Sequence, residues 1–593
     1  MIRSMVALVL GFLSAAPLMG QSNMQVITDP EATLRINGRA VLVDVVVTDK
    51  SGRAVPGLRK NDFEVNENGK RQEIDFFEPH FAVAPGEVAT AQPLPPNTFT
   101  NVPAVAPNEA VNVLLMDALN TSMRDQMYVR LQMVKYLASL PPGIRVGVFV
   151  LGARLRIVQG FTTDSTLLRA SIDRLAGKPS TSALESTPDE RTAQTSAMGE
   201  MNSMAQGPGG AELAQTIANL QSFLDQSTSF EQNQQLQITL DSLQTIAHYL
   251  TGVPGRKNLI WFVGSFPLCL PGLTSSMTGC PYEDEYHKTI NALAAARVSV
   301  YPVDAHGLLA PADDIGGAGR DISSSLPAGT SLPLPNAAGT VSSSPNPYFS
   351  FINTETWAEA TGGKAFHGNG FKEELAEAID NGSRYYTIAY TPKDRKEIGR
   401  ERKVDVRTVD GQFKLAYRHS YFEQTPKELK IAEAAPAKDH LRPLMDRGMP
   451  SFTELRYRVK VEPSNPQPAP NAPHGGDNPN LNGPLTRYTV RFFLAPGGLN
   501  LIQGPDGVRR QTIEVALMAY SQDGKPLNWQ VRSIGLAIRP EQNAIAQSSG
   551  IPFHFDFDAP PGDVYLRTGV YDASTSRAGT LEIPLTSITV ARK

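Results

Sequence analysis

The stretch from Val111 to Thr121, VNVLLMDALNT, contains the pattern on which the interpretation of the fold depends. An apolar run without alternation is typical of a strand that is covered on both faces. This run ends abruptly at Asp117, which small polar residues follow. Because open α/β sheets bind ligands at the carboxyl ends of their strands, we expect Asp117 to lie at an accessible sheet edge.

Helical and strand-like segments alternate on the carboxyl-terminal side of this run. Apolar residues recur at helical spacing from Asp125 to Leu140, and Pro141 begins a turn that ends the helix. The pattern repeats with helical segments at 165–175, 236–250 and 286–296, and with buried strands at 146–151, 258–263 and 298–303. Such alternation predicts an α/β fold in which helices cover both faces of a doubly wound, mostly parallel sheet.

The order of several motifs extends this interpretation. The strand that ends in Asp117 is followed by LPPGIRVGVFVLGARLRIVQGFT, GRKNLIWFVGSFP, YPVDAHGL, WAEATGGKAF and YYTIAYTP, and is preceded by VLVDVVVTDKSGRAVPGLRKNDFEVNENGKRQEIDFF. In this order the motifs resemble the von Willebrand factor type A-like domain group of acidobacterial secreted proteins. The resemblance covers roughly residues 33 to 425. It implies a Rossmann-like von Willebrand A-type domain.

The resemblance also implies a candidate cation site. Domains of this type bind a divalent cation through a D-x-S-x-S turn after the first strand. Here Asp117 holds the first position and Thr121 the last, whereas Leu119 replaces the middle serine. The candidate metal ligands are therefore Asp117 and Thr121, with Mg²⁺ or Mn²⁺ as the cation.

The remaining ligands of such a site are weakly represented. The second-loop hydroxyl has candidates in Ser180, Thr181 and Ser182, and Ser265 follows the fourth strand where the family places an aspartate. Because Mg²⁺ takes six oxygen ligands, this set predicts a weak site. The alternative, that Asp117 and Asn120 cap the following helix with a contribution of about 1 kcal/mol, is favoured by the ligand count.

Composition limits the classes of protein that the chain can belong to. It has 593 residues, of which 41% are hydrophobic and 19% charged, so several globular domains are expected. The formal charge of -4 argues against a broad nucleic-acid-binding surface. Residues 1–22 have the pattern of a signal peptide and predict a secreted or periplasmic protein with no later membrane span. In such a compartment, Cys269 and Cys280 are expected to form a disulfide.

The chain divides into several predicted parts. A small β unit at 33–80 and an Ala- and Pro-rich linker at 81–108 precede the α/β domain. That domain spans 109–425 and has insertions at 180–233 and 311–347. Seven strand candidates at 452–593 predict an immunoglobulin- or fibronectin-like β-sandwich. One strand, 553–558, alternates three phenylalanines with His554, Asp556 and Asp558, and core-solvent alternation explains these residues better than a metal site.

These features predict a non-enzymatic interaction or adhesion protein. We expect a protein partner to dock on a rim around Asp117 that is formed by Asn120, Ser122, Ser265 and Asp304. One alternative is a structural component of the cell envelope that has no ligand site. A second alternative is a hydrolase acting on an extracellular polymer, which requires Ser265, His306 and Asp304 to converge.

Overall fold

The computed structural model describes the greater part of the chain. The described residues are 41–81, 94–102, 110–121, 123–139, 144–175, 211–253, 255–264, 282–305, 347–366, 376, 382–393, 401–422, 441–465, 467, 473–575 and 577–589. Several predictions fall outside these residues: the signal peptide, positions 180–182, nearly all of the second insertion, and Ser122, Ser265, Cys269, Cys280 and His306.

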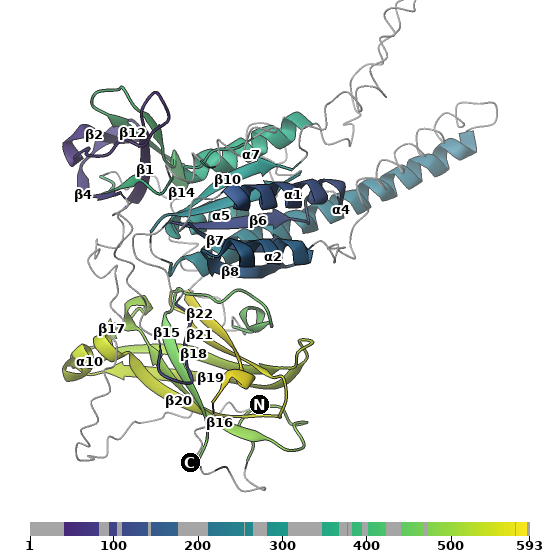
Figure 1. Ribbon diagram of the computed structural model, residues 1–593, viewed down its shortest axis with the longest axis vertical. Coiled ribbons are helices and arrows are strands. Elements are labelled where there is room, and N and C mark those ends of the chain that lie inside the picture. The colour runs from purple at the N-terminus through teal and green to yellow at the C-terminus, as the bar shows by residue number, and fades with distance from the viewer. Residues whose placement is uncertain are drawn as a thin grey trace, which may run out of the picture.

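A five-stranded sheet forms the centre of the α/β domain (Figure 1). Its order is β10-β9-β6-β7-β8. The strands are β6 (Val111–Asp117), β7 (Arg145–Leu151), β8 (Leu155–Thr162), β9 (Lys257–Val263) and β10 (Val298–Asp304). β6, β7, β9 and β10 pair in parallel, whereas β8 runs antiparallel to β7. The other sheets of the described chain are antiparallel, so the molecule is a mixed α/β protein with several sheets.

Helices cover both faces of this sheet, and side-chain alternation determines which residues each face contributes. Helices α1 (Met123–Ser139) and α2 (Ser165–Leu175) pack with Leu114 and Met116 on one face. Helices α4 (Ala211–Leu250), α5 (Glu283–Ala295) and α7 (Pro347–Thr361) pack with Val113 and Leu115 on the other. The two helical layers are visible on either side of the sheet in Figure 1.

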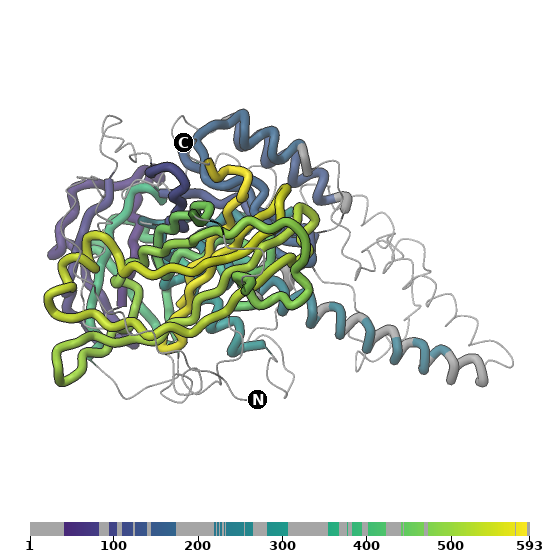
Figure 2. Tube along the Cα trace, turned by 90° about the horizontal axis from the view of Figure 1, so that it is seen from below, coloured from purple at the N-terminus to yellow at the C-terminus, as the bar shows by residue number. Residues whose placement is uncertain are grey.

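Helix α4 corrects one predicted boundary. The sequence suggested an insertion that ends at residue 233 and a separate helix at 236–250, but the structure has one continuous helix of 40 residues. At 1.5 Å per residue this helix is about 60 Å long. Its carboxyl-terminal half lies on the sheet, and its amino-terminal half extends beyond the body of the molecule (Figure 2).

The small β unit is built from two distant parts of the chain. Its amino-terminal strands are β1 (Val41–Thr48), β2 (Phe63–Glu67), β3 (Lys70–Gln72) and β4 (Ile74–His80). They join β11 (Tyr385–Tyr390), β12 (Glu401–Thr408), β13 (Lys414–Ala416) and β14 (Ser420–Phe422) in two sheets, β13-β1-β11-β4 and β14-β12-β2-β3. The segment 385–422, predicted to belong to the α/β domain, therefore belongs here. Its apolar residues complete a core that the amino-terminal strands could not close alone.

A buried ion pair joins the two parts of the β unit. The Arg402 guanidinium lies 2.7 Å from the Glu67 carboxylate, and both side chains are 2% exposed. The hydroxyls of Tyr390 and Tyr421 donate to the same carboxylate at 2.8 and 2.9 Å. These partners satisfy a charge whose burial would otherwise be costly.

The carboxyl-terminal region is a two-sheet β-sandwich around one apolar core. One sheet has the order β20-β16-β15-β5, and in the other β17, β18, β21 and β22 follow one another while β19 pairs with β18. Strand β5 (Thr98–Thr100) lies within the predicted linker at 81–108 and pairs with β15. Part of the predicted linker therefore belongs to the sandwich. The remaining strands are β15 (Tyr457–Pro463), β16 (Thr486–Leu494), β17 (Ile502–Gln503), β18 (Arg509–Tyr520), β19 (Pro526–Ile538), β20 (Ile551–Ala559), β21 (Tyr565–Asp572) and β22 (Arg577–Pro584); a short helix, α10 (Asn543–Ser549), precedes β20.

The α/β domain contacts the sandwich at the end of α4. The Thr453 hydroxyl accepts the Gly252 N–H and donates to the Tyr249 carbonyl, both at 2.8 Å. A Cβ atom at Gly252 would lie 2.6 Å from Thr453 atoms, so the contact requires glycine. On the other side of the domain, the Arg297 guanidinium donates to both carboxylate oxygens of Asp44 in the β unit, at 2.8 and 3.0 Å.

Candidate functional site

Asp117 ends β6 but does not point into an open edge. It continues the face of Val113 and Leu115, which packs beneath α4, α5 and α7, and its exposure is 0%. The prediction of an accessible carboxylate at the rim is therefore wrong. The physical reason is the two-residue repeat of the strand, which directs alternate side chains beneath a helical layer.

The Asp117 carboxylate accepts four hydrogen bonds from the protein. Oδ1 accepts the backbone N–H groups of Leu119 at 3.2 Å and Asn120 at 2.9 Å. Oδ2 accepts the Asn120 side-chain amide at 2.8 Å and the Trp261 indole N–H at 3.0 Å. A carboxylate offers about four lone-pair positions, so this one is saturated. Burial raises the pKa of Asp117 to about 6, against the opposing effect of these donors.

The loop after β6 is fixed by further side-chain contacts. The Asn120 amide also donates to the Thr239 hydroxyl of α4 at 2.8 Å. The Gln126 amide of α1 donates to the carbonyls of Ala118 and Thr121 at 3.1 and 2.9 Å. The loop is thereby tied to a helix on each face of the sheet.

Thr121, the other predicted metal ligand, is also engaged. Its hydroxyl oxygen accepts the Gly264 N–H at 3.0 Å. A Cβ atom at Gly264 would lie 3.1 Å from the Asn120 carbonyl oxygen, so the two loops are in close contact. This contact joins the end of β9 to the loop after β6.

These residues do not fit a divalent cation. A metal ion needs carboxylate lone pairs that face it, whereas both oxygens of Asp117 face N–H donors. The described part of the chain also contains no group of three His, Cys, Asp or Glu side chains arranged to hold a metal. The capping interpretation is closer to the structure, but Asp117 caps the turn at 118–120, which precedes α1.

The predicted rim is only partly described. Asn120 and Thr121 are each 7% exposed. Asp304 ends β10 at the same edge, but β9 lies between β6 and β10 and separates the two acids by about 10 Å. Because Ser265 and His306 lie outside the described residues, the structure does not test their convergence with Asp304.

Sequence reasoning missed Trp261 and Thr239, the two distant partners of this loop. Trp261 lies in the NLIWFV run, and alternation places it on the face of Leu259 and Val263. Since Asp117 lies on the same face of the neighbouring strand, alternation across both strands is the signal that could have paired them. Trp261 in turn packs edge-to-face against Trp357 of α7, with ring centroids 5.8 Å apart.

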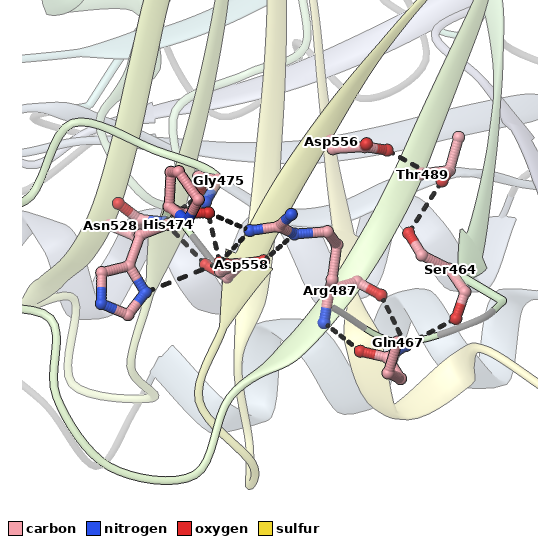
Figure 3. Close-up of polar contacts among 10 residues, drawn as sticks. Ser464, Gln467, His474, Gly475, Arg487, Thr489, Asn528, Asp556 and Asp558 are labelled. Atoms are coloured by element: carbon pink, nitrogen blue, oxygen red, sulfur yellow. Dashed lines mark hydrogen bonds and ion pairs between the residues drawn. The ribbon is translucent and has the colours of Figure 1, made fainter. Parts of the chain in front are cut away.

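The alternating acids of β20 are part of a polar network on the sandwich (Figure 3). The Arg487 guanidinium donates to both oxygens of Asp558 at 2.7 and 2.9 Å, and Asp558 also accepts the Gly475 N–H at 2.8 Å. Asp556 accepts the Thr489 hydroxyl at 2.9 Å. His554 and Asp556 are exposed, as the predicted alternation requires, whereas Asp558 is 3% exposed. The network anchors the loop around residue 475 to the sheet.

No family model matches the chain, and no curated protein matches it. Among the described helices, none has the length and apolar character that a membrane crossing requires.

Several solved structures resemble parts of the chain. One is an aerotolerance-related membrane protein from Bacteroides fragilis, with 11% identity and a TM-score of 0.22 over 46% of this chain and 98% of that chain. The protein BatB from Bacteroides thetaiotaomicron matches with the same values. A von Willebrand factor type A structure from Catenulispora acidiphila has 11% identity and a TM-score of 0.23 over 56% of this chain and 74% of that chain. Matches at these TM-scores do not indicate a function for this chain.

Proposed function

We propose that this chain is a non-enzymatic protein-interaction protein that binds a partner protein along the projecting half of α4, without a bound cation. The observation that carries the proposal is a group of exposed apolar side chains on this helix. Phe223 and Phe230 are 66% and 68% exposed, and Leu220 is 39% exposed. At 100° per residue, the three lie within about 80° of one another around the helix. We name these residues the α4 stripe.

The two halves of α4 have different surroundings. Leu236, Leu240 and Leu243 are buried against the central sheet and fix the helix to the domain. The α4 stripe lies on the half that extends beyond the sheet (Figure 2). Solvent-exposed phenylalanines on one helical face are typical of a surface that a partner covers, because leaving them in water is unfavourable.

The charge of α4 supports a partner of one chemical kind. From Ala211 to Leu250 the sequence contains Glu212, Asp225, Glu231 and Asp241, and neither lysine nor arginine. A complementary partner presents apolar side chains flanked by lysine or arginine, so that opposite charges attract during association. A second copy of this chain would instead bring acidic helices together.

The proposal excludes two parts of the interaction model that the sequence suggested. The carboxylate of Asp117 does not bridge to the partner through a cation, because four N–H donors occupy it. The contact surface is α4 and not the sheet edge. The expected signal peptide at 1–22 would place this interaction outside the cytoplasm.

A photo-crosslinking amino acid at Gln226, an exposed position of α4, tests the proposal in the native host. We expect a crosslinked heterologous protein that disappears when Phe223 and Phe230 are both replaced by aspartate. The matched control is Met127→Asp, which alters an apolar residue that is 68% exposed on α1. The proposal is refuted if the double variant crosslinks as wild type does, or if the only crosslinked protein is a second copy of this chain.

A further inference from the structure

A polar cleft lies between the α/β domain and the sandwich. None of its lining residues belongs to the α4 stripe. Its volume is about 600 Å³, and it is lined by the β7–β8 turn and the start of β8, the loop after residue 445, the end of β18 with the β18–β19 turn, and β22. A volume of this size accommodates a small-molecule ligand. The residues that matter for its chemistry are Arg154, Arg156, Arg447, Asp446, Asp523 and Glu582.

Arg154 and Arg156 supply unneutralised positive charge to this cleft. Leu155 between them is 3% exposed and packs in the domain core, so the two flanking side chains project away from the core on the same side of the chain. Both arginines are exposed. Within the described residues, neither guanidinium has a hydrogen-bond or ion-pair partner.

Arg447 contributes a third guanidinium that is held in place. It lies 3.9 Å from the centre of the Tyr565 ring and donates to the Ser521 carbonyl at 3.1 Å. Stacking of this kind fixes the plane of an arginine while leaving some of its five N–H donors available.

The acids of the cleft are mostly engaged by other groups. Glu582 accepts the Gly448 N–H at 2.9 Å and lies 3.5 Å from the Arg567 guanidinium. Asp523 accepts the Ser521 hydroxyl. The lining has three arginines and three acids, and Arg567, which pairs with Glu582, is fully buried behind it. Within the described residues, the arginines of the lining without a partner are Arg154 and Arg156. The cleft lining is therefore formally neutral as a whole, with the two arginines without a partner on the α/β side and the three acids on the sandwich side.

We propose that this cleft binds a small ligand through an oxyanion group, with Arg154 and Arg156 as the main contacts. Guanidinium groups bind phosphate, sulfate and carboxylate oxygens through paired N–H donors. A ligand of this class would contact the α/β domain through these arginines and the sandwich through Arg447. Binding would therefore also strengthen the contact between the two domains.

Calorimetric titration of the full chain with inorganic phosphate, sulfate and citrate, each in a separate experiment at matched ionic strength, tests this inference. We expect saturable binding of at least one anion, and the preferred anion identifies the charged group of the natural ligand. An Arg154→Ala/Arg156→Ala double variant should lose affinity by tenfold or more. Both residues are exposed, so the variant is expected to fold, and circular dichroism verifies this.

The control variant is Arg169→Ala, which removes an exposed arginine from α2, away from the cleft lining. It should retain wild-type affinity. The inference is overturned if none of the three anions binds saturably, or if the double variant and the control bind with the affinity of wild type. Either result leaves the proposal for the α4 stripe unaffected, because that surface is tested by a different assay.

Discussion

Replacing Asp117 by asparagine tests whether a buried, donor-saturated carboxylate holds the loop after β6. Asparagine caps exposed turns as well as aspartate does, so an exposed cap would tolerate the change. In this site the new NH₂ group would face the donors on Oδ2, which come from Asn120 and Trp261. Leaving two buried donors without an acceptor costs roughly 2–4 kcal/mol.

The same variant isolates the pH dependence of this carboxylate. The pKa of Asp117 rises from 3.8 to about 6 on folding, because burial disfavours its charged form. The folded state then binds the proton more tightly than the unfolded state does. The associated stabilisation is present below pH 3.8 and is lost as the pH rises through about 6. Two pKa units correspond to about 3 kcal/mol, of which roughly 2 kcal/mol falls between about pH 4.5 and pH 8.

The assay is urea unfolding across this pH range, followed by tryptophan fluorescence. A Trp529→Phe background removes the tryptophan of the sandwich and leaves Trp261 and Trp357 in the α/β domain. The quantity to compare is the difference in free energy of unfolding between the protein with Asp117 and its Asp117→Asn variant. This difference should decrease by roughly 2 kcal/mol from about pH 4.5 to pH 8. A difference that is constant or that increases with pH would refute the reasoning.

Three further outcomes follow from the structure. Calorimetric titration of the wild-type chain with Mg²⁺ or Mn²⁺ should give no saturable heat, because the lone pairs of Asp117 are occupied; micromolar binding lost in an Asp117→Ala variant would contradict this. Arg402→Ala should lower the free energy of unfolding of the β unit by about 3–5 kcal/mol, since it leaves the Glu67 carboxylate buried without its cation; a loss below about 1 kcal/mol in urea unfolding would count against the pair. Gly252→Ala should cost about 1–3 kcal/mol by overlap with Thr453 and should increase cleavage between the α/β domain and the sandwich in limited proteolysis; an unchanged cleavage pattern would show that the contact adapts.

The central sheet could be predicted from sequence because its strands carry local signals. Apolar runs bounded by turns identified β6, β7, β9 and β10 within one or two residues. The position of β11 could not be predicted in this way. All six of its residues are buried, so its sequence, YYTIAY, has the pattern of a central parallel strand although it pairs antiparallel with β1. Local sequence does not state which of two sheets such a strand joins.

The continuity of α4 was missed for a different reason, although Leu213, Ile217, Leu220 and Leu224 recur at helical spacing in its projecting half. The segment from Asp225 to Gln235, DQSTSFEQNQQ, has few apolar residues and therefore little helical periodicity. This segment is nevertheless helical, because it is continuous with the buried half of α4 and extending an existing helix is easier than starting a new one.

The strand-end position of Asp117 could be predicted from sequence, but the direction of its side chain could not. The position of Asp117 at a strand end is a local property, and the structure bears it out. Its contact with Trp261 depends on the pairing of β6 with β9, whose registers join residues about 145 positions apart. The metal interpretation assigned Asp117 to a position of the D-x-S-x-S motif, but the motif does not say toward which face of the sheet the side chain points. Strand alternation determines that direction.

The interleaved order of the strands affects how the chain is assembled during synthesis. Residues 41–80 leave the ribosome first, yet their sheet partners at 385–422 are made more than 300 residues later. Strand β5 is likewise synthesised long before β15, the strand with which it pairs. The α/β domain between them has all its strands within 111–304 and can fold while both flanking β regions are incomplete. Nascent chains should therefore expose unpaired strand edges for much of translation, a period in which chaperone binding would protect them from aggregation.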